Sequence, residues 1–271
     1  PVQRIRIRYT KEGRVRFVSA RDLTSVWERA LRRADLPIAY SEGFSPHAKV
    51  SFPDALPVGY ASTGEYAELT FAVPIDPGPD LGRLSATLPG GMDITTYLEV
   101  PDGAPKLAKM LGATLWELVL PEADEDAATA QVDRLRDASD ELVAATSAEV
   151  LRLRPNGEEK PIDVRPALLA LRAFLRPADT GGALHPTLRA VLRNDGPTVR
   201  PTDLFTALTS RRDPAADRGA SPPPSDAPAD ALPTPRVHRR VAQGEPLDGG
   251  LREALSGEVV PLEPARSAEA A

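Results

Sequence analysis

The chain has 271 residues, of which 41% are hydrophobic and 27% are charged, and its formal net charge is −6. These values are typical of a soluble globular protein with one large or two small domains. Because the sequence has no cysteine and only three histidines, it excludes a cysteine-bound iron–sulfur cluster, a thiolate zinc site, a disulfide and a cysteine nucleophile. We therefore expect neither a metal nor another cofactor.

The sequence has no hydrophobic run of about 18 residues, and its first residues lack the basic and then apolar layout of a signal peptide. We therefore expect a cytoplasmic protein without a membrane partner. The charge is unevenly distributed, because residues 1–60 hold eleven lysines and arginines against six acidic residues, a balance of +5, and the rest of the chain carries −11. An anionic partner would respond to this local basic region rather than to the average charge.

Residues 4–9 alternate arginine with hydrophobic residues, which predicts a β-strand with Ile5, Ile7 and Tyr9 on one face. Residues 11–13 predict a turn, and residues 14–18 again alternate basic and hydrophobic side chains. This second stretch is expected to be a hairpin partner of the strand or a bent extension of it. Five arginines would then share a surface that either binds an anion or is a charged, exposed face of the sheet. They are Arg4, Arg6, Arg8, Arg14 and Arg16.

Ser19 and Asp22 form a variant of the capping box and predict the start of a helix. Hydrophobic residues then recur with helical spacing, so one side of the helix is expected to face the core. The other side carries arginines, and Glu28 is placed to pair with Arg32 one turn later. The apolar stripe comprises Leu23, Val26, Trp27, Ala30 and Leu31, and the arginines are Arg21, Arg29, Arg32 and Arg33.

The stretch at residues 41–52 concentrates polar and aromatic side chains between this helix and a predicted strand. Gly43 can adopt a positive φ and Pro46 restricts the residue before it, so the loop is expected to have a defined shape. Such a loop is typical of a binding site, and a bend whose His47 and Lys49 simply face water is the alternative. The candidate binding residues are Ser41, Gly43, Phe44, Ser45, His47 and Lys49.

Further strands and a second short helix complete the first part of the chain. The resulting order is β-α-β-β-α-β, the ferredoxin-like arrangement, in which two helices cover one face of an antiparallel four-stranded sheet. We therefore expect an α+β protein whose first domain spans residues 1–103. The additional elements are strands at 38–52, interrupted by the loop, 65–73 and 92–100, and a helix at 79–88.

A second ferredoxin-like unit is expected at residues 104–210, so that two such units would stand in tandem. From residue 211 to 271 the sequence is rich in proline, alanine, aspartate and serine, which predicts a disordered tail. The basic cluster at 236–240 within that tail is a candidate contact for nucleic acid or a partner. The elements predicted in the second unit are strands at 114–120, 150–154, 162–175 and 184–192, a helix ending near 145 and a helix at 201–208.

Several short motifs follow one another along the chain. They are residues 15–23, 30–34, 40–49, 56–59 and 65–66 in the first half, and 162–166 and 198–201 in the second. Together these motifs resemble those of the radical SAM-linked protein family, which is catalogued as a domain of unknown function. The resemblance covers residues 2–210, and the tail lies outside it.

Members of that family are often fused to, or encoded beside, a radical S-adenosylmethionine enzyme, while actinobacterial members often stand alone. The resemblance therefore implies a stand-alone accessory protein. Because this chain has no three-cysteine cluster site, a separate enzyme would have to supply any radical chemistry in trans. The chain departs from the motif at Ala20, where the resemblance leads us to expect histidine in many relatives, and this departure argues against a second catalytic imidazole beside His47.

The first functional hypothesis is a non-catalytic module that binds a structured RNA such as tRNA, or presents it to a partner enzyme. It rests on the arginine-rich strand, the helix arginines and the loop, which combines stacking with phosphate contacts. The candidate residues for binding RNA or a partner are Arg4, Arg6, Arg8, Arg14, Arg16, Arg21, Arg32, Arg33, Ser41, Gly43, Phe44, Ser45, His47, Lys49, Arg165 and Arg200.

Two alternatives stay open at this point. One is a metal-independent endoribonuclease, by analogy with CRISPR repeat-processing enzymes built from paired ferredoxin-like units, with His47 as the candidate catalytic acid or base. The other is a protein–protein docking module, in which Arg165 and Arg200 form stabilising ion pairs with Asp163 and Asp203. The sequence does not indicate an oligomeric state.

Overall fold

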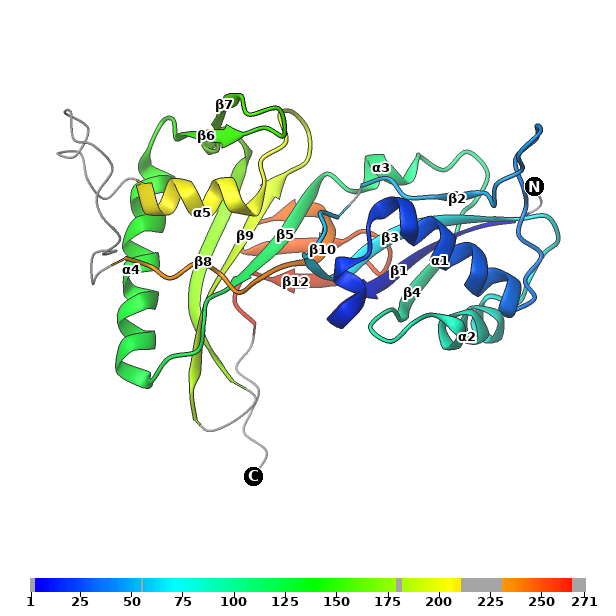
Figure 1. Ribbon diagram of the computed structural model, residues 1–271, viewed down its shortest axis with the longest axis horizontal. Helices are drawn as coiled ribbons and strands as arrows, with labels where there is room; N and C mark the ends of the chain where they lie inside the picture. Colours follow the sequence, from blue (N-terminus) through cyan, green and yellow to red (C-terminus); the bar gives the residue numbers. More distant parts are fainter. Residues whose placement is uncertain (1–2, 55, 179–181, 211–230, 265–271) are drawn as a thin grey trace. The chain divides into compact units, whose positions relative to one another are not determined.

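The chain forms two compact units in the computed structural model (Figure 1). The protein is a mixed α+β protein in which most strand pairings are antiparallel. No helix in the described ranges is long and apolar enough to cross a membrane. The structure describes residues 3–54, 56–178, 182–210 and 231–264. Unit 1 comprises Pro1–Thr114, Arg239–Leu247 and Leu251–Val260, and unit 2 comprises Leu115–His238, Asp248–Gly250 and Pro261–Ala271.

The sheet of unit 1 is built around β3, a strand of 11 residues. Strands β4, β1 and β3 are neighbours in this order, and both pairings are antiparallel. The other edge of β3 is divided, since β2 pairs antiparallel with Leu69 and Glu68, whereas β10 pairs parallel with Ala61 and Ser62. These strands are β1 (Gln3–Lys11), β2 (Val50–Ser51), β3 (Ala61–Phe71), β4 (Ile94–Glu99) and β10 (Val237–Leu247), and β11 (Gly250–Glu253) and β12 (Val259–Pro261) follow.

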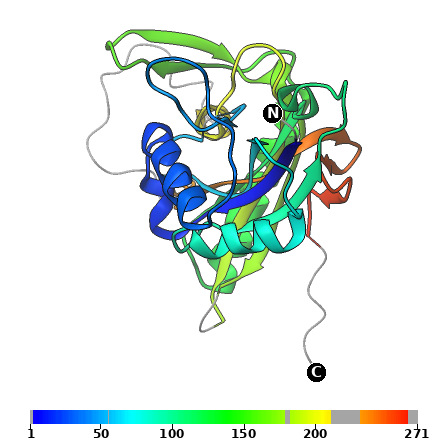
Figure 2. The ribbon, with the colours of Figure 1, turned by 90° about the vertical axis from the view of Figure 1, so that its right-hand side faces the viewer.

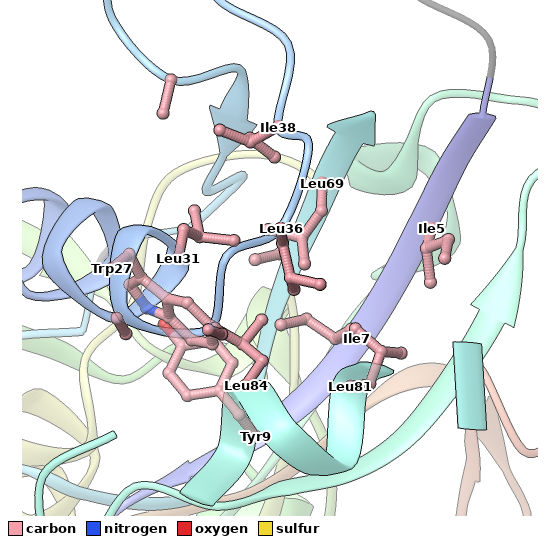
Figure 3. Packing of buried hydrophobic residues seen from close by; sticks show 14 of the residues in the cluster. Ile5, Ile7, Tyr9, Trp27, Leu31, Leu36, Ile38, Leu69, Leu81 and Leu84 are labelled. Atoms are coloured by element: carbon pink, nitrogen blue, oxygen red, sulfur yellow. The ribbon is translucent and has the colours of Figure 1, made fainter. Parts of the chain in front are cut away.

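Two helices cover one face of this sheet, α1 (Ala20–Arg33) and α2 (Pro77–Thr87) (Figures 1 and 2). The predicted cap is confirmed, because Ser19 Oγ accepts a hydrogen bond from the Asp22 N–H at 3.1 Å. The predicted stripe of α1 is confirmed too: Trp27 is fully buried and its ring meets that of Tyr9 edge to face at 5.0 Å (Figure 3). The alternation of β1 thus places its hydrophobic residues under α1 and α2.

The opposite face of the sheet is also covered. Tyr66 of β3 packs there with Leu107 from α3 (Leu107–Met110), with Leu111 and with Leu255. Arg6 of β1 is therefore buried within a second layer of protein, whereas Arg4 and Arg8 are partly exposed. The alternating sequence predicts that β1 has an arginine face, but it does not reveal which distant segments cover that face.

Residues 14–18 are not a strand. Residues 14–17 lie in a 3-10 helix, η1 (Gly13–Phe17), which follows β1 and places Val15 in the core, and Val18 is the extended residue after it. Gly13 has a φ of +59°, which glycine adopts at little cost and which turns the chain away from the sheet. The alternating pattern is too short here to distinguish a strand from one turn of helix.

The prediction of a disordered tail from residue 211 is wrong for residues 231–264, which contain β10, β11 and β12. Residues 211–230 and 265–271 lie outside the described residues. Residues 237–240 of the basic cluster belong to β10, where Arg239 pairs with Glu12 at 3.1 Å. Little in the sequence indicates this strand, because only Val237 and Val241 of β10 are β-branched and the partner β3 is far away in sequence.

Gly64 permits β10 to lie close to β3. A Cβ atom on Gly64 would come within 2.6 Å of Val241 O and 2.8 Å of Ala242 Cα, both in the β10 backbone. Only a residue without a side chain fits at this position.

Unit 2 packs a long helix, α4, against an antiparallel strand pair, β8 and β9, with β9 also neighbouring β5. Strands β6 and β7 form a separate hairpin, and α5 packs against α4. The elements are β5 (Ala113–Val119), α4 (Glu125–Ala144), β6 (Glu149–Leu153), β7 (Glu159–Asp163), η2 (Arg165–Ala167), β8 (Leu168–Pro177), β9 (Leu184–Arg193) and α5 (Pro201–Ser210).

The second ferredoxin-like unit is not confirmed, because four strands follow α4 without an intervening α-helix. The strand predicted at 162–175 is divided into β7 and β8 by the turn η2, which contains Pro166. A proline fixes φ and removes a backbone donor, so the strand ladder is interrupted there. Tandem ferredoxin-like units therefore do not follow from the observed element order.

We predict that Gly64→Ala lowers the free energy of unfolding by about 1–3 kcal/mol, because the new methyl group displaces β10 from β3. Gly82→Ala is the matched control: Gly82 lies inside α2 with open space around its Cα, so the same change should stabilise by about 0.5–1 kcal/mol. Urea unfolding followed by circular dichroism measures both. Equal effects of the two substitutions would contradict the close approach of β10.

Candidate functional site

The loop predicted as a binding site is closed at its base. Ser41 Oγ accepts a hydrogen bond from the His47 N–H at 3.0 Å, and the Ser41 N–H donates to His47 O at 2.9 Å. Tyr40 and Ala48 form a β-bridge directly beneath, and the Lys49 N–H donates to Ala39 O at 2.8 Å. These bonds fix both ends of the loop, so its tip is presented from a defined base.

The tip of this loop is exposed. Phe44 has an exposed fraction of 111%, so its ring lies entirely in solvent, and Ser45, His47 and Lys49 are exposed as well. Gly43 has a φ of +124°, which a side chain would strain, so glycine is needed to place Phe44 as it is. An aromatic ring and two basic side chains thus share one short segment.

The predicted arginines of α1 also face solvent. Arg21, Arg32 and Arg33 are exposed. Arg32 has the predicted partner Glu28, although the closest atoms are 4.0 Å apart and the arginine side chain is 69% exposed. An exposed pair of this kind is worth well under about 1 kcal/mol, so Arg32 could exchange its partner for a phosphate at little cost.

The arginines of β1 are held inside unit 1. Arg6 is 2% exposed; its Nε donates to Glu68 at 2.9 Å, and its other nitrogens contact Met110 Sδ and Pro105 O. Arg8 donates to the carbonyls of Thr63 and Val241, and Arg4 shares Glu68. These guanidinium groups satisfy acceptors of the fold, so the five arginines do not form one exposed surface.

Arg14 and Arg16 lie in η1. Arg14 is exposed, whereas Arg16 is half-buried and its guanidinium lies 4.8 Å from the centre of the Phe17 ring. The cation–π contact orients Arg16 along the surface. Of the strand and turn arginines, Arg14 is therefore exposed to an anionic partner, and the side chain of Arg4 is 38% exposed although it shares Glu68.

Arg165 and Arg200 belong to unit 2 and act mainly within its fold. Arg165 Nε donates to Val143 O and Ala145 O at the end of α4, where a cation is favourable. The Arg200 backbone N–H donates to Asp203 at 2.7 Å, but the side chain that pairs with Asp203 is Arg152. The expected ion pairs of Arg165 with Asp163 and of Arg200 with Asp203 are thus replaced by backbone contacts and a different arginine.

A cavity of about 160 Å³ lies in unit 1, at the end of β1 where its register shifts against both β3 and β4. Strand irregularities of this kind often redirect side chains towards a site. One part of the wall is apolar and the other is ionisable. The apolar part comprises Ala20, Leu23, Phe52 and Leu56. The polar part comprises Tyr9, Lys11, Asp54, Glu65 and Tyr66.

Arg240, from β10, neutralises the acidic groups of this cavity. Its Nη1 donates to Glu65 at 2.9 Å and its Nη2 donates to Asp54 at 2.8 Å. Arg240 and Glu65 are almost completely buried, whereas the Asp54 side chain is 44% exposed. Lys11 is also buried, and its Nζ donates to Val18 O at 2.8 Å. Four charged groups are thus gathered around one small space.

Burial controls the ionisation of this cluster. It raises the pKa of Glu65, although the charge of Arg240 opposes that shift. Burial also lowers the pKa of Lys11, which the Glu65 charge opposes. Tyr9 has a raised pKa because it is buried and lies near Glu65, so its hydroxyl stays protonated at neutral pH.

A second network ties the last strands to β3. The Tyr66 hydroxyl donates to Glu253 at 2.8 Å and accepts from the Gln243 N–H at 3.1 Å, and Gln243 Nε2 donates to Asp54 at 2.9 Å. Burial would raise the pKa of Glu253, but hydrogen bonds from Ser256, Leu255 and Tyr66 lower it overall. This network helps to hold Asp54 at the cavity.

Sequence reasoning did not identify the cavity residues. Lys11 continues the inward-facing series after Ile5, Ile7 and Tyr9, which was a signal for a buried cation, although the residue falls in a predicted turn. Glu65 and Tyr66 belong to the motifs that carry the family resemblance. Arg240 could not be found, because the segment around it has the composition of a tail. Ala20, where the resemblance suggests histidine, lines the cavity.

The described residues contain no group of three or more histidine, aspartate or glutamate side chains arranged to hold a metal ion. The charged cluster instead resembles a salt-bridge network, in which arginine and lysine neutralise carboxylates. Its chemistry is suited to hydrogen bonding and to proton transfer.

The fold and the site define a mixed α+β protein with an exposed basic loop and a small, charged cavity. The chain belongs to the family described as "Uncharacterized protein conserved in bacteria (DUF2344)", whose model matches residues 4–201. No curated protein matches the sequence. A solved structure of an unknown protein from Galdieria sulphuraria is 13% identical in sequence to this chain. The match covers 77% of this chain and 88% of the Galdieria chain. Its TM-score of 0.22 is too low to support a structural argument.

We predict that Arg240→Met destabilises the protein by about 3–5 kcal/mol, because Glu65 would be left as an uncompensated buried charge. Arg252→Met is the matched control, since Arg252 is half-exposed and pairs only loosely with the exposed Glu245 at 3.6 Å; it should cost less than about 0.5 kcal/mol. Urea unfolding measures the free energy of unfolding of both variants and of the wild type.

The double variant Arg240→Met/Glu65→Leu tests whether the buried charge of Glu65 causes this loss of stability. Because it removes both buried charges, it should recover part of the stability that Arg240→Met loses. If the double variant is as unstable as the sum of its single substitutions, the ion pair does not cause the effect.

Proposed function

We propose that this protein is a non-catalytic RNA-binding module that grips RNA through the loop at residues 41–49 and presents it to a separate enzyme. The observation that carries the proposal is the fully exposed Phe44, held on a closed loop beside His47 and Lys49. A nucleobase can stack on such a ring, and each base–aromatic stack contributes about 1–3 kcal/mol. The closed loop loses little entropy on binding, because its base is already ordered.

Electrostatics support RNA as the partner. Residues 1–60 carry a local balance of +5. Their exposed lysines and arginines lie on η1, on α1 and on the loop, and they are Arg14, Arg21, Arg29, Arg32, Arg33 and Lys49. Phosphate contacts supply affinity and orientation, and the aromatic ring adds contact with bases. The arginines of β1 are not part of this proposal, because each of them already donates to an acceptor within unit 1.

The partner enzyme in this proposal is a radical SAM enzyme in the cytoplasm, as the sequence resemblance implies. The family match supports the relationship to bacterial proteins without assigning an activity. The neighbour order β4-β1-β3, with β2 at the edge, supports a ferredoxin-like reading of unit 1. In that arrangement the 41–49 loop lies between α1 and the edge strand, where it can reach a partner.

An endoribonuclease that uses His47 is the competing function. Among the described residues, none forms a recorded hydrogen bond with the His47 ring, so a group that would orient it as a catalytic base is not supplied by this part of the chain. Protein docking through the same loop is the other possibility. Binding measured with purified RNA, together with inspection of that RNA for cleavage, separates the three.

We predict that Phe44→Ala weakens RNA binding by about 1–3 kcal/mol, which corresponds to roughly 5- to 150-fold in Kd. Tyr97→Ala is the matched control, because Tyr97 is also a partly exposed aromatic residue but lies on β4; it should leave Kd unchanged. Fluorescence anisotropy with labelled oligo(U) and with tRNA measures the affinities.

Lys49→Ala should reduce the slope of log Kd against log salt concentration by about one, because one phosphate contact is lost. Intact RNA after prolonged incubation is expected with the wild type. Failure of the wild type to bind any RNA would contradict the proposal, and cleavage that disappears in His47→Ala would favour the nuclease.

A further inference from the structure

The cavity of unit 1 has the size and the lining of a site for one flat ring. Its volume of about 160 Å³ is close to that of an engineered protein cavity of about 150 Å³ that holds benzene. Phe52, Leu23 and Leu56 provide apolar surfaces that can contact the faces of a ring. A single six-membered ring therefore fits, whereas a fused two-ring system does not without displacement of the wall.

The remaining wall offers hydrogen-bonding groups of both kinds. An ammonium group has three N–H donors, and the recorded hydrogen bond of Lys11 Nζ, to Val18 O, uses one of them. Glu65 supplies a carboxylate acceptor, and the protonated Tyr9 hydroxyl can donate or accept. All three side chains are more than nine-tenths buried, so they present donors and acceptors at fixed positions.

The cavity has an entrance that a ligand can use. Among its described lining residues, Ala20 and Asp54 are exposed. Ala20 is the first residue of α1, and its small side chain leaves the opening unobstructed. The cavity also lies close to the loop along the chain, because Phe52 follows Lys49 by three residues, a span of at most about 10 Å.

We infer that this cavity binds a pyrimidine base, taken from the RNA strand that the 41–49 loop grips. This inference rests on the proposed function. The edge of uracil or cytosine presents a donor beside an acceptor, which matches Glu65 and Lys11, while the ring packs against Phe52 and Leu23. Extruded bases are commonly read in this way, by hydrogen bonds to the base edge and by aromatic or apolar contacts to its faces.

Two substitutions test the cavity without altering the loop. Ala20→Leu obstructs the entrance with a good helix former at an exposed position, and Lys11→Met removes the ammonium group while keeping its length. Ser25→Leu is the matched control, because Ser25 is an exposed residue of the same helix and does not line the cavity. Circular dichroism establishes that each variant is folded.

The measurement is the Kd for oligo(U), oligo(C) and oligo(A) of equal length, together with saturation-transfer NMR of free uridine and cytidine. The wild type and Ser25→Leu should prefer a pyrimidine strand by about tenfold, the contribution of about one hydrogen bond. Ala20→Leu and Lys11→Met should lose that preference and still bind oligo(A) with the wild-type Kd. Phe44→Ala should weaken all three strands equally.

RNA binding without a pyrimidine preference, or a preference that survives both cavity substitutions, overturns the inference and leaves the proposed function standing. The protein could instead bind free uridine in a way that depends on Ala20 and Lys11, and bind no RNA. That result overturns the proposed function and the inference that the base comes from an RNA strand, but it supports the pyrimidine site. Pyrimidine-selective RNA binding that both cavity variants lose supports both.

Discussion

The buried guanidinium of Arg240 is the constraint on which unit 1 depends. It lies between Glu65 on β3 and Asp54 in the segment that follows β2, although it comes from a strand about 175 residues later in the chain. A buried arginine without such partners would be very costly, and so would a buried Glu65 without Arg240. The N-terminal sheet and β10 therefore complete each other, and the cavity exists because this pairing neutralises its wall.

The same arrangement decides which charges are available for function. Both faces of the unit 1 sheet are covered, so Arg6 and Arg8 act as internal donors to carbonyl and carboxylate oxygens. Among residues 1–60, the exposed lysines and arginines belong to η1, to α1 and to the 41–49 loop. Binding residues are often carried on loops that a rigid scaffold holds in place. Here the hydrogen bonds between Ser41 and His47 close the loop, and the Lys49 N–H joins it to Ala39 O.

The sequence correctly predicted the elements that depend only on residues close together in the chain. The stripe around Trp27 and the Ser19 cap needed only helical spacing and one hydrogen bond, and the alternation of β1 required only neighbouring residues. The loop could be recognised by its glycine, proline and polar residues. The sequence did not predict the features that depend on distant partners. These are the segments that cover the arginine face and the division of β7 from β8. The main one is the folded segment at 231–264, which pairs with β3 across more than 150 residues.

Hydrogen exchange measured by mass spectrometry on the wild-type protein tests this account most directly, through peptides that cover residues 61–71 and 239–247. If β10 completes the sheet and Arg240 stabilises it, both peptides should be strongly protected and should open together, with similar free energies. If the peptide at 239–247 exchanges as fast as an unstructured chain while the peptide at 61–71 stays protected, β10 is not part of the core and the central claim is contradicted.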